Sequence, residues 1–583
     1  MLRSLTIFIV ERTARIVLHV GDGHNLKWES SNALYAVTGR GASDNPFSGT
    51  RQVTLPKSSF PIGLDVFAGQ NATLSTLQLP EQDKAIYVWG RMAHPQRSGD
   101  DLLRWIAEIV DSGDLRSLSK LIGMFVLLID DRRAGAIHMF SDVMGVRPWF
   151  VATDGTHLTC GSSVWPIREA GLCGPSLDYT SIGSWLYFGY CVTGGSLFED
   201  CRRLPARYVL SLRDGILSQR EFAPLQGDNR RVPQEQIADH VHDQVSMVID
   251  RLCPRDGKII VPLSGGYDSR LAAAIAARKK LDLQAVTIDE GEETAIAIAV
   301  ADALKLSHEI MPTDGSLWNI FHEPFLSLPE GMPITRQFSD PVARKYPGRP
   351  QLNGWMGDIL VRVSGNKSDR DLEFKPLDEL TPALVRRRRM EGQRFDLLEP
   401  PSLLPRIEVR AQAAARKLHE CGRPWGRPFL YDGTFGRHRY FMSNNMFEHL
   451  DVAEAIVPFY TWDLILSRFV NDYDCFTWET YELLFQRHFP DIAAIPHAGR
   501  LPDRQPKFRP ISRCTPRWAR QMLMRLPRRD FLPVLNRRKA IPRLLGAAVG
   551  RAKHERTVFF LQRLYLLEQK LASNGITLDW GKI

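Results

Sequence analysis

The clearest chemical pattern in the chain follows a short apolar strand, Ile259 to Leu263. The strand leads into Ser264-Gly-Gly-Tyr-Asp-Ser269, and an alanine-rich helix, Asp268 to Lys280, begins at once. The first turn of a helix offers unpaired N–H groups and a partial positive charge, which together bind phosphate. Gly265 and Gly266 have no Cβ atom, so the backbone can approach an anion closely. The segment therefore predicts a phosphate-binding loop.

The polar side chains of this loop refine the prediction. The hydroxyls of Ser264 and Ser269 add hydrogen-bond donors. Asp268 would repel phosphate, so we expect it to hold Mg²⁺, which bridges carboxylate and phosphate oxygens. The string is neither a Walker A loop nor a dinucleotide fingerprint, and it resembles the pyrophosphate loop of the N-type ATP pyrophosphatases. We expect ATP and Mg²⁺ as cofactors, with adenine near the strand ends at Leu263 and Ile288.

The elements around this loop alternate between strand and helix. The apolar spacing predicts helices at 234–252 and 292–304 and strands at 283–288 and 308–311. Such alternation is typical of a doubly wound parallel sheet. Further helices are expected at 441–455 and 462–471.

The chain before this region is rich in short strands. The strands are expected at Leu5 to Val10, Ala85 to Trp89, Met124 to Ile129, Ala136 to Phe140 and Tyr208 to Leu212, with one helix at Asp101 to Val110. The polar stretch 226–233 is predicted to be a linker. We therefore expect domains at 1–225 and 234–500, with an insertion near 376–405 and a basic carboxyl-terminal extension at 501–583.

Composition limits the class of protein. A chain of 583 residues is too long for one core, and its 44% hydrophobic and 24% charged residues are typical of soluble globular proteins. No segment reaches the length of a membrane span. The eight cysteines include no C-x-x-C pair, so a disulfide framework or a zinc site is not expected, and we expect a cytoplasmic protein.

The positive charge is concentrated at the carboxyl end. The net charge is +9, whereas residues 500–583 hold 20 Lys+Arg and 5 Asp+Glu; a smaller basic cluster lies at 386–389. A solvated basic surface is the favoured interpretation. The alternative is a landing site for an acidic peptide, a nucleic acid or another subunit.

Beyond the loop, the chain resembles the asparagine synthetase family over most of its length. The resemblance rests on motifs at Ser119–Asp130, Ser141–Phe150, Ser264–Ser269, Glu293 with Ala295 and Ala299, Asn353–Asp358, and Glu454–Phe459. It implies an α/β protein with an amino-terminal glutaminase-like (Ntn-type) β-sandwich domain and a carboxyl-terminal ATP-pyrophosphatase domain. It also implies that Gly354 belongs to the nucleotide site and that Mg²⁺ is shared by Asp268 and Asp358.

The chain departs from this family in ways that bear on its substrate. Family glutaminases use a cysteine directly after the initiator Met, whereas Leu2 stands here and the first cysteine is Cys160. Leucine supplies no nucleophile, so we expect a domain that generates no ammonia. The motif arginine and aspartate are replaced by Ile456 and Thr461, which disfavours an aspartate-like substrate.

Two branches of the family have lost the glutaminase and use an amine of the substrate itself, namely the β-lactam synthetases and the lasso-peptide cyclases. We favour the cyclase because of the chain's length, its insertion and its basic extension. The expected partner is a peptide, delivered by a leader-peptide-binding protein and a protease, with no nucleic acid and no membrane span. The alternatives are a β-lactam or asparagine-type synthetase and a non-catalytic nucleotide-binding scaffold.

The resemblance also implies roles for several side chains. Glu454 matches the family's base, which a tyrosine orients, with Tyr440 and Tyr431 as candidates. Arg500 or Lys507 would replace the family's late lysine and stabilise developing negative charge.

Overall fold

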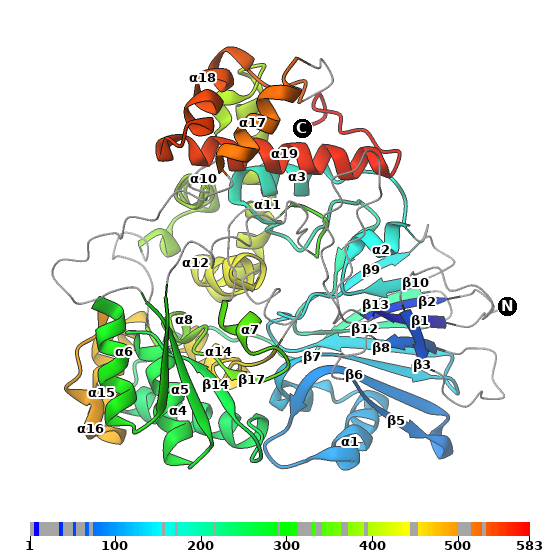
Figure 1. Ribbon diagram of the computed structural model, residues 1–583. Helices are drawn as coiled ribbons and strands as arrows, with labels where there is room; N and C mark the ends of the chain where they lie inside the picture. Colours follow the sequence, from blue (N-terminus) through cyan, green and yellow to red (C-terminus); the bar gives the residue numbers. More distant parts are fainter. Residues whose placement is uncertain are drawn as a thin grey trace.

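The computed structural model places antiparallel sheets, a parallel sheet and a layer of helices in three regions (Figure 1). It describes residues 5–10, 34–38, 50–53, 64–68, 74–153, 158–169, 173–213, 216–289, 292–312, 329–333, 341–362, 371–389, 394–443, 453–498, 515–527 and 532–583. None of the helices in these ranges combines the length and the apolar content that a membrane span requires.

The amino-terminal region contains two sheets. The first has seven strands in the order β1-β3-β4-β2-β10-β9-β11, and the second has six antiparallel strands in the order β13-β12-β8-β7-β6-β5. Their bounds are β1 Leu5–Val10, β2 Leu34–Thr38, β3 Thr50–Val53, β4 Leu64–Ala68, β5 Leu74–Leu79, β6 Lys84–Ala93, β7 Ile122–Asp131, β8 Ala136–Ser141, β9 Phe150–Thr153, β10 Leu158–Gly161, β11 Cys201–Arg203, β12 Tyr208–Arg213 and β13 Ile216–Glu221. Every residue of β7 is buried, which explains its nearly continuous apolar sequence.

The parallel sheet has five strands in the order β16-β15-β14-β17-β18. The strands are β14 Ile259–Pro262, β15 Leu283–Ile288, β16 Ser307–Met311, β17 Pro350–Leu352 and β18 Glu454–Ile456. The chain runs outward from β14 to β16 and then returns to the other side of β14 for β17 and β18. This confirms the doubly wound prediction, and it places a topological switch point at the carboxyl ends of β14 and β17, where such sheets bind ligands.

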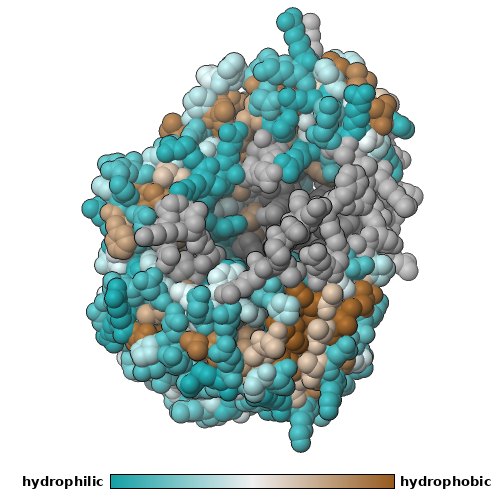
Figure 2. Space-filling model, turned by 90° about the vertical axis from the view of Figure 1, so that its left-hand side faces the viewer, coloured by the Kyte–Doolittle hydropathy of each residue, from teal (hydrophilic) through white to brown (hydrophobic). Residues whose placement is uncertain are grey.

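Helices flank the sheets and form the upper layer in Figure 1. Their bounds are α1 Gly99–Ser112, α2 Val164–Glu169, α3 Tyr179–Phe188, α4 Gln234–Leu252, α5 Tyr267–Arg278, α6 Glu292–Ala303, α7 Pro341–Lys345, α8 Gly357–Leu360, α10 Leu377–Arg388, α11 Leu403–Gly422, α12 Pro428–Tyr431, α14 Trp462–Val470, α15 Trp478–His488, α16 Pro490–Ala493, α17 Thr515–Arg525, α18 Arg537–Ala548 and α19 Glu555–Ser573, together with the π-helix η7 Asp432–Met442. The face of the molecule in Figure 2 is hollowed near its centre, between the helices that flank the parallel sheet and the carboxyl-terminal helices above.

One predicted helix is wrong at its carboxyl end, where the described residues resume after 443. The sequence predicts a helix at 441–455, whereas Glu454–Ile456 forms β18. This strand pairs in parallel with β17, with Glu454 opposite Pro350 and Ile456 opposite Leu352. Pairing with a distant strand therefore overrides the local helical pattern.

Candidate functional site

The Ser264–Ser269 segment, here called the glycine loop, joins β14 to α5 and is held by its own hydroxyls. The N–H of Ser264 donates to Ser269 Oγ at 3.1 Å, and the N–H of Gly266 donates to Ser264 Oγ at 3.2 Å. The two hydroxyl oxygens lie 3.0 Å apart. Gly266 is the N-cap residue of α5 and forms no side-chain cap. The start of α5 therefore keeps donor groups that an anion would satisfy.

The Asn353–Asp358 segment, here called the aspartate loop, follows β17 and packs directly on the glycine loop. A Cβ atom at Gly354 would lie 2.5 Å from the backbone nitrogen of Ser269. A Cβ atom at Gly357 would lie 2.6 Å from Asp268 Oδ1. Only glycine permits this approach. Two loops that are far apart in sequence thus bring the Asp268 and Asp358 side chains together at the switch point.

The proximity of two carboxylates changes their electrostatics. Burial, with Asp358 beside it, raises the pKa of Asp268 to about 7, while hydrogen bonds from the Tyr481 hydroxyl and from the Asp358 backbone oppose this shift. The Asp358 side chain is 42% exposed, so the pair is open to solvent on one side. A divalent cation would relieve the repulsion, and two carboxylates suit Mg²⁺. The donor set therefore fits a magnesium ion held by Asp268 and Asp358.

Two side chains at this site were not predicted from the sequence. The hydroxyl of Tyr481, on α15, donates a short hydrogen bond to Asp268 Oδ1. His438, on η7, is buried and places its Nε2 atom 4.0 Å from Asp358 Oδ1. Burial lowers the pKa of His438 to about 4, although Asp358 opposes the shift. Neither residue belongs to a local motif, so the sequence carries no signal for them.

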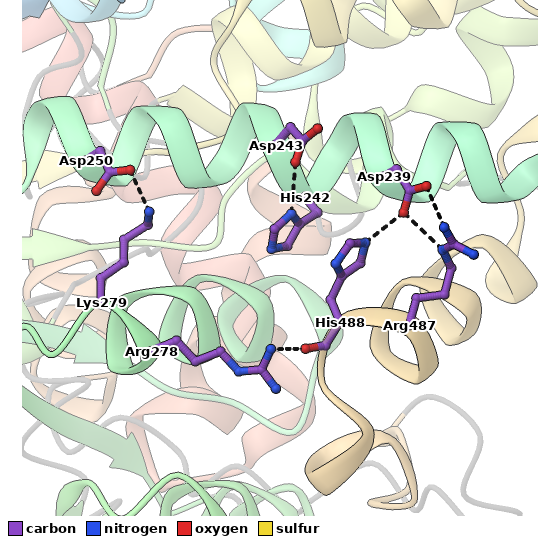
Figure 3. Close-up of polar contacts among 8 residues, drawn as sticks. All are labelled: Asp239, His242, Asp243, Asp250, Arg278, Lys279, Arg487 and His488. Carbon is purple, nitrogen blue, oxygen red and sulfur yellow. Dashed lines mark hydrogen bonds and ion pairs between the residues drawn. The ribbon is translucent and has the colours of Figure 1, made fainter.

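Helix α5, which bears Asp268, is attached to α4 and α15 (Figure 3). Arg278, near its carboxyl end, donates to the carbonyl oxygen of His488. Asp239 of α4 accepts from Arg487 at 3.0 and 2.7 Å and contacts His488 at 2.8 Å. The rings of His242 and His488 stack with centroids 3.9 Å apart. Helix α15 thus holds α5 at both ends, through Tyr481 and through His488.

The stretch after α16 covers one side of the glycine loop. Arg270, fully buried in α5, donates to the carbonyl oxygens of Ile495 and Pro496 at 2.7 and 2.8 Å. The N–H of Ala498 donates to the carbonyl oxygen of Gly265 at 3.2 Å. Through this hydrogen bond, the chain at Ala498 lies against the glycine loop. The predicted cations Arg500 and Lys507 lie outside the described residues.

The two residues predicted to contact adenine, Leu263 and Ile288, lie at the ends of strands β14 and β15. Leu263 is 2% exposed, its N–H donates to the carbonyl oxygen of Val286 at 2.9 Å, and its carbonyl oxygen accepts from the Thr287 hydroxyl at 2.8 Å. Ile288, the last residue of β15, packs against a small apolar cluster. Leu263 directly precedes the glycine loop, and a contact of either residue with adenine stays a prediction.

The predicted base and its candidate tyrosines each contact the amino-terminal region. Glu454 opens β18, level with the start of β17, and its Oε2 atom lies 3.3 Å from Arg91 Nε on β6. The ring of Tyr440 lies between the guanidinium groups of Arg203 and Arg439, at 5.4 and 4.9 Å. Glu454 thus joins the parallel sheet, and Tyr440 joins η7, to the amino-terminal region.

Tyr431, the second candidate, is likewise held by the amino-terminal region. Its hydroxyl accepts a hydrogen bond from Arg207 Nη2 at 3.3 Å.

Comparison with known proteins bears on the amino-terminal region. The family described as glutamine amidotransferase domain matches residues 100–223, which cover α1, β7 to β13 and the turn between Asp142 and Arg147. This region has the fold of an Ntn-type glutamine amidotransferase domain. No curated protein matches the chain.

Two solved structures are similar at 10% and 11% identity. One is a glutamine phosphoribosylpyrophosphate amidotransferase from B. subtilis, complexed with ADP and GMP (TM-score 0.19, 50% of this chain and 61% of that chain). The other is described as the allosteric regulatory enzyme of purine biosynthesis (TM-score 0.20, 66% of this chain and 72% of that chain). The chain thus spans 61% of the length of the first enzyme.

The cysteines of the amidotransferase domain are not poised as nucleophiles. Cys160, Cys173, Cys191 and Cys201 are all buried. Burial raises the pKa of Cys173 to about 12 and raises the pKa of the other three thiols as well. A thiol acts as a nucleophile through its thiolate, so these four side chains serve the core of the amidotransferase domain.

The motif around Asp142 has a structural role in the amidotransferase domain. Asp142 accepts from the N–H groups of Met144 and Val146 at 3.0 and 3.4 Å, and Gly145 takes a positive φ of 59°. Arg147 is buried and stacks over Trp89 at 4.4 Å. The turn packs against η7, since a Cβ atom at Gly145 would lie 2.8 Å from Arg439 Nη2. Arg439 also donates to the carbonyl oxygen of Leu204 at 2.6 Å.

Proposed function

We propose that the protein is an ATP-dependent carbon–nitrogen ligase that activates a carboxylate as an acyl-adenylate and then forms an amide, releasing AMP and pyrophosphate. The observation that carries the proposal is the contact between the glycine loop and the aspartate loop at the switch point of a doubly wound sheet. This arrangement offers backbone N–H groups for phosphate and two adjacent carboxylates within one site.

Each loop has a distinct task in this proposal. The glycine loop and the start of α5 bind the pyrophosphate part of ATP. Asp268 and Asp358 hold Mg²⁺, which supplies charge neutralisation for the phosphate oxygens when it is bound. The Tyr481 hydroxyl donates to the Asp268 carboxylate and restrains its orientation. The site is thus ordered before the substrate arrives, which reduces the reorganisation that the reaction requires.

The reaction would proceed in two steps. The substrate carboxylate attacks the α-phosphorus of ATP, and the bond to pyrophosphate breaks. A substrate amine then attacks the acyl carbon, AMP leaves, and the amine loses a proton. Because Glu454 pairs with Arg91, the proposal assigns no proton transfer to it.

We infer that the amine belongs to the same molecule as the carboxylate, so that the product is a macrolactam of lasso-peptide type. The inert thiols of the amidotransferase domain support an amine that does not come from glutamine. The upper helical layer, which contains α10, α11, α17, α18 and α19, supports a peptide rather than a small acid (Figure 1). A leader-peptide-binding protein and a protease would deliver such a peptide.

The test is to incubate the full chain with ATP, Mg²⁺ and candidate precursor peptides and to measure AMP, pyrophosphate and peptide mass. We expect AMP together with the loss of one water from the peptide. Asp268→Asn should abolish both, whereas Asp302→Asn, an exposed carboxylate of α6, should abolish neither.

The alternatives give different results in the same assay. AMP formed with a small carboxylic acid would indicate a β-lactam or asparagine-type synthetase. ATP binding without AMP would indicate a nucleotide-binding scaffold.

A further inference from the structure

An exposed apolar stripe is formed by Ile541 and Leu545 of helix α18 and by Val549, the residue that caps its carboxyl end. The three side chains are 39%, 53% and 74% exposed and are spaced four residues apart, so they lie on one side of the helix. The buried residues of α18 include Leu544 and Ala547. The stripe runs for about 12 Å at the rise of an α-helix. Single exposed apolar residues are ordinary, whereas an aligned row marks an interaction surface.

The stripe lies in a strongly positive segment. Residues 531–554 contain six Lys+Arg and no Asp or Glu. Arg538, Lys539, Arg551 and Lys553 form no ion pair with any carboxylate of the described residues. Arg543, by contrast, is paired with Asp396 at 2.6 Å. Four cations that pair with no carboxylate of the described residues therefore share this short segment with the stripe.

The neighbouring helix extends the same surface. Arg520 of α17 donates to the carbonyl oxygen of Ala548 at 3.3 Å, which places a cation beside the carboxyl end of the stripe. Met524, one turn further along α17, is 72% exposed. Both helices lie at the top of the molecule, where Figure 2 shows hydrophobic residues among hydrophilic ones.

We propose that this surface docks an acidic amphipathic helix of a peptide or protein partner. The apolar face of such a helix would cover Ile541, Leu545 and Val549, and its carboxylates would meet the cations on either side. A nucleic acid would use the cations but would leave the central stripe exposed. A second copy of the chain would bring cations against cations. The proposal concerns binding alone and does not depend on ATP chemistry.

The experiment uses the full chain and a fluorescent synthetic helix with leucine at every third and fourth position and glutamate elsewhere. A scrambled peptide of the same composition and a single-stranded DNA of the same charge are the competitors. We expect the amphipathic peptide to bind about tenfold tighter than the scrambled one, since burying one aliphatic side chain contributes roughly that factor. Its affinity should also fall as salt rises.

Variants separate the two components of the surface. Leu545→Glu should weaken binding about tenfold or more, and the pair Arg538→Glu with Lys539→Glu should weaken it and flatten its salt dependence. The matched control is Val409→Glu on α11, where the native side chain is 65% exposed. This substitution should leave the affinity for the peptide unchanged. The proposal would be overturned if both peptides bound equally. It would also be overturned if the DNA bound as tightly as the amphipathic peptide and Leu545→Glu left that binding intact. A dimer of the chain that Leu545→Glu converts to a monomer would overturn it as well.

Discussion

Tyr481 illustrates how one hydroxyl orders the candidate site. It donates to Asp268, and Gly357 packs against both, since a Cβ atom there would lie 2.6 Å from the Tyr481 hydroxyl oxygen and from Asp268 Oδ1. Asp268 and Asp358 were predicted from motifs because each follows a glycine turn after a strand. Tyr481 and His438 were not predicted because helices α15 and η7 reach the site only through tertiary packing.

Tyr481→Phe removes this hydroxyl while keeping the ring. A hydrogen bond to a charged group contributes about 1.5–3 kcal/mol, so we expect ATP-dependent activity to fall about tenfold or more. The measurement is AMP release together with circular dichroism to check folding. Tyr346→Phe is the control, because its hydroxyl donates to Glu309 on the edge strand β16. Equal activities for both variants would contradict the role given to Tyr481.

Gly354→Ala tests the contact between the two loops. The added Cβ would meet backbone atoms of Ser269 and Asp268 at 2.5 and 2.7 Å, and backbone cannot move aside cheaply. We expect a loss of stability of about 1–3 kcal/mol and a loss of nucleotide binding. Chemical denaturation and ATP titration measure the two effects. Gly433→Ala on η7, which has open space around it, should change neither.

At the scale of elements, the parallel sheet follows the sequence closely. The helix at 234–252 and the strand at 283–288 have the predicted bounds, because apolar runs between buried layers define them. The helix predicted at 441–455 failed where β18 pairs with β17. The π-helix η7 was also not predicted, and its Arg439 and His438 contact separate regions of the chain.

The stacked rings of His242 and His488 make the α4–α15 contact sensitive to pH. Burial lowers the pKa of His242 below its ordinary value; His488 adds to this effect and Asp243 opposes it. Protonation of His242 therefore favours the unfolded chain. The contribution of the neutral His242 ring to the stability of the fold is present above the ordinary histidine pKa and is lost as the pH falls below that value. The melting temperature should fall more between about pH 7 and pH 5.5 in the native protein than in His242→Phe.

The control for this measurement is His240→Phe on the same helix, which lies outside the stack. It should retain the pH dependence of the native protein. If His242→Phe also retains the pH dependence of the melting temperature, the stacked histidines do not cause that dependence.

At the scale of the whole molecule, the two regions share one apolar core. Its members include Val126 of β7, Val261 of β14 and Leu564 of α19. The predicted linker is also anchored, since the N–H of Arg230 donates to the carbonyl oxygen of Val470 and its own carbonyl accepts from Asp472, at 2.8 and 2.7 Å. Composition identified this polar stretch, but the contacts that fix it come from residues far along the chain.

A shared core predicts cooperative unfolding. We expect one calorimetric transition for the full chain, with similar calorimetric and van't Hoff enthalpies. Arg207 contacts Tyr431 across the two regions. Arg207→Met should therefore lower the temperature of the single unfolding transition without splitting it into two. Two separate transitions in the native protein would show that the regions fold independently.

The central claim is that the glycine loop and the two adjacent carboxylates bind ATP with magnesium. Equilibrium dialysis of radiolabelled ATP against the full chain, with and without Mg²⁺, tests it directly. We predict that the native chain binds ATP saturably and only when Mg²⁺ is present. The double variant Asp268→Asn, Asp358→Asn should remain folded but should lose this binding. Binding that persists unchanged in the double variant, or no binding by the native chain, would contradict the claim.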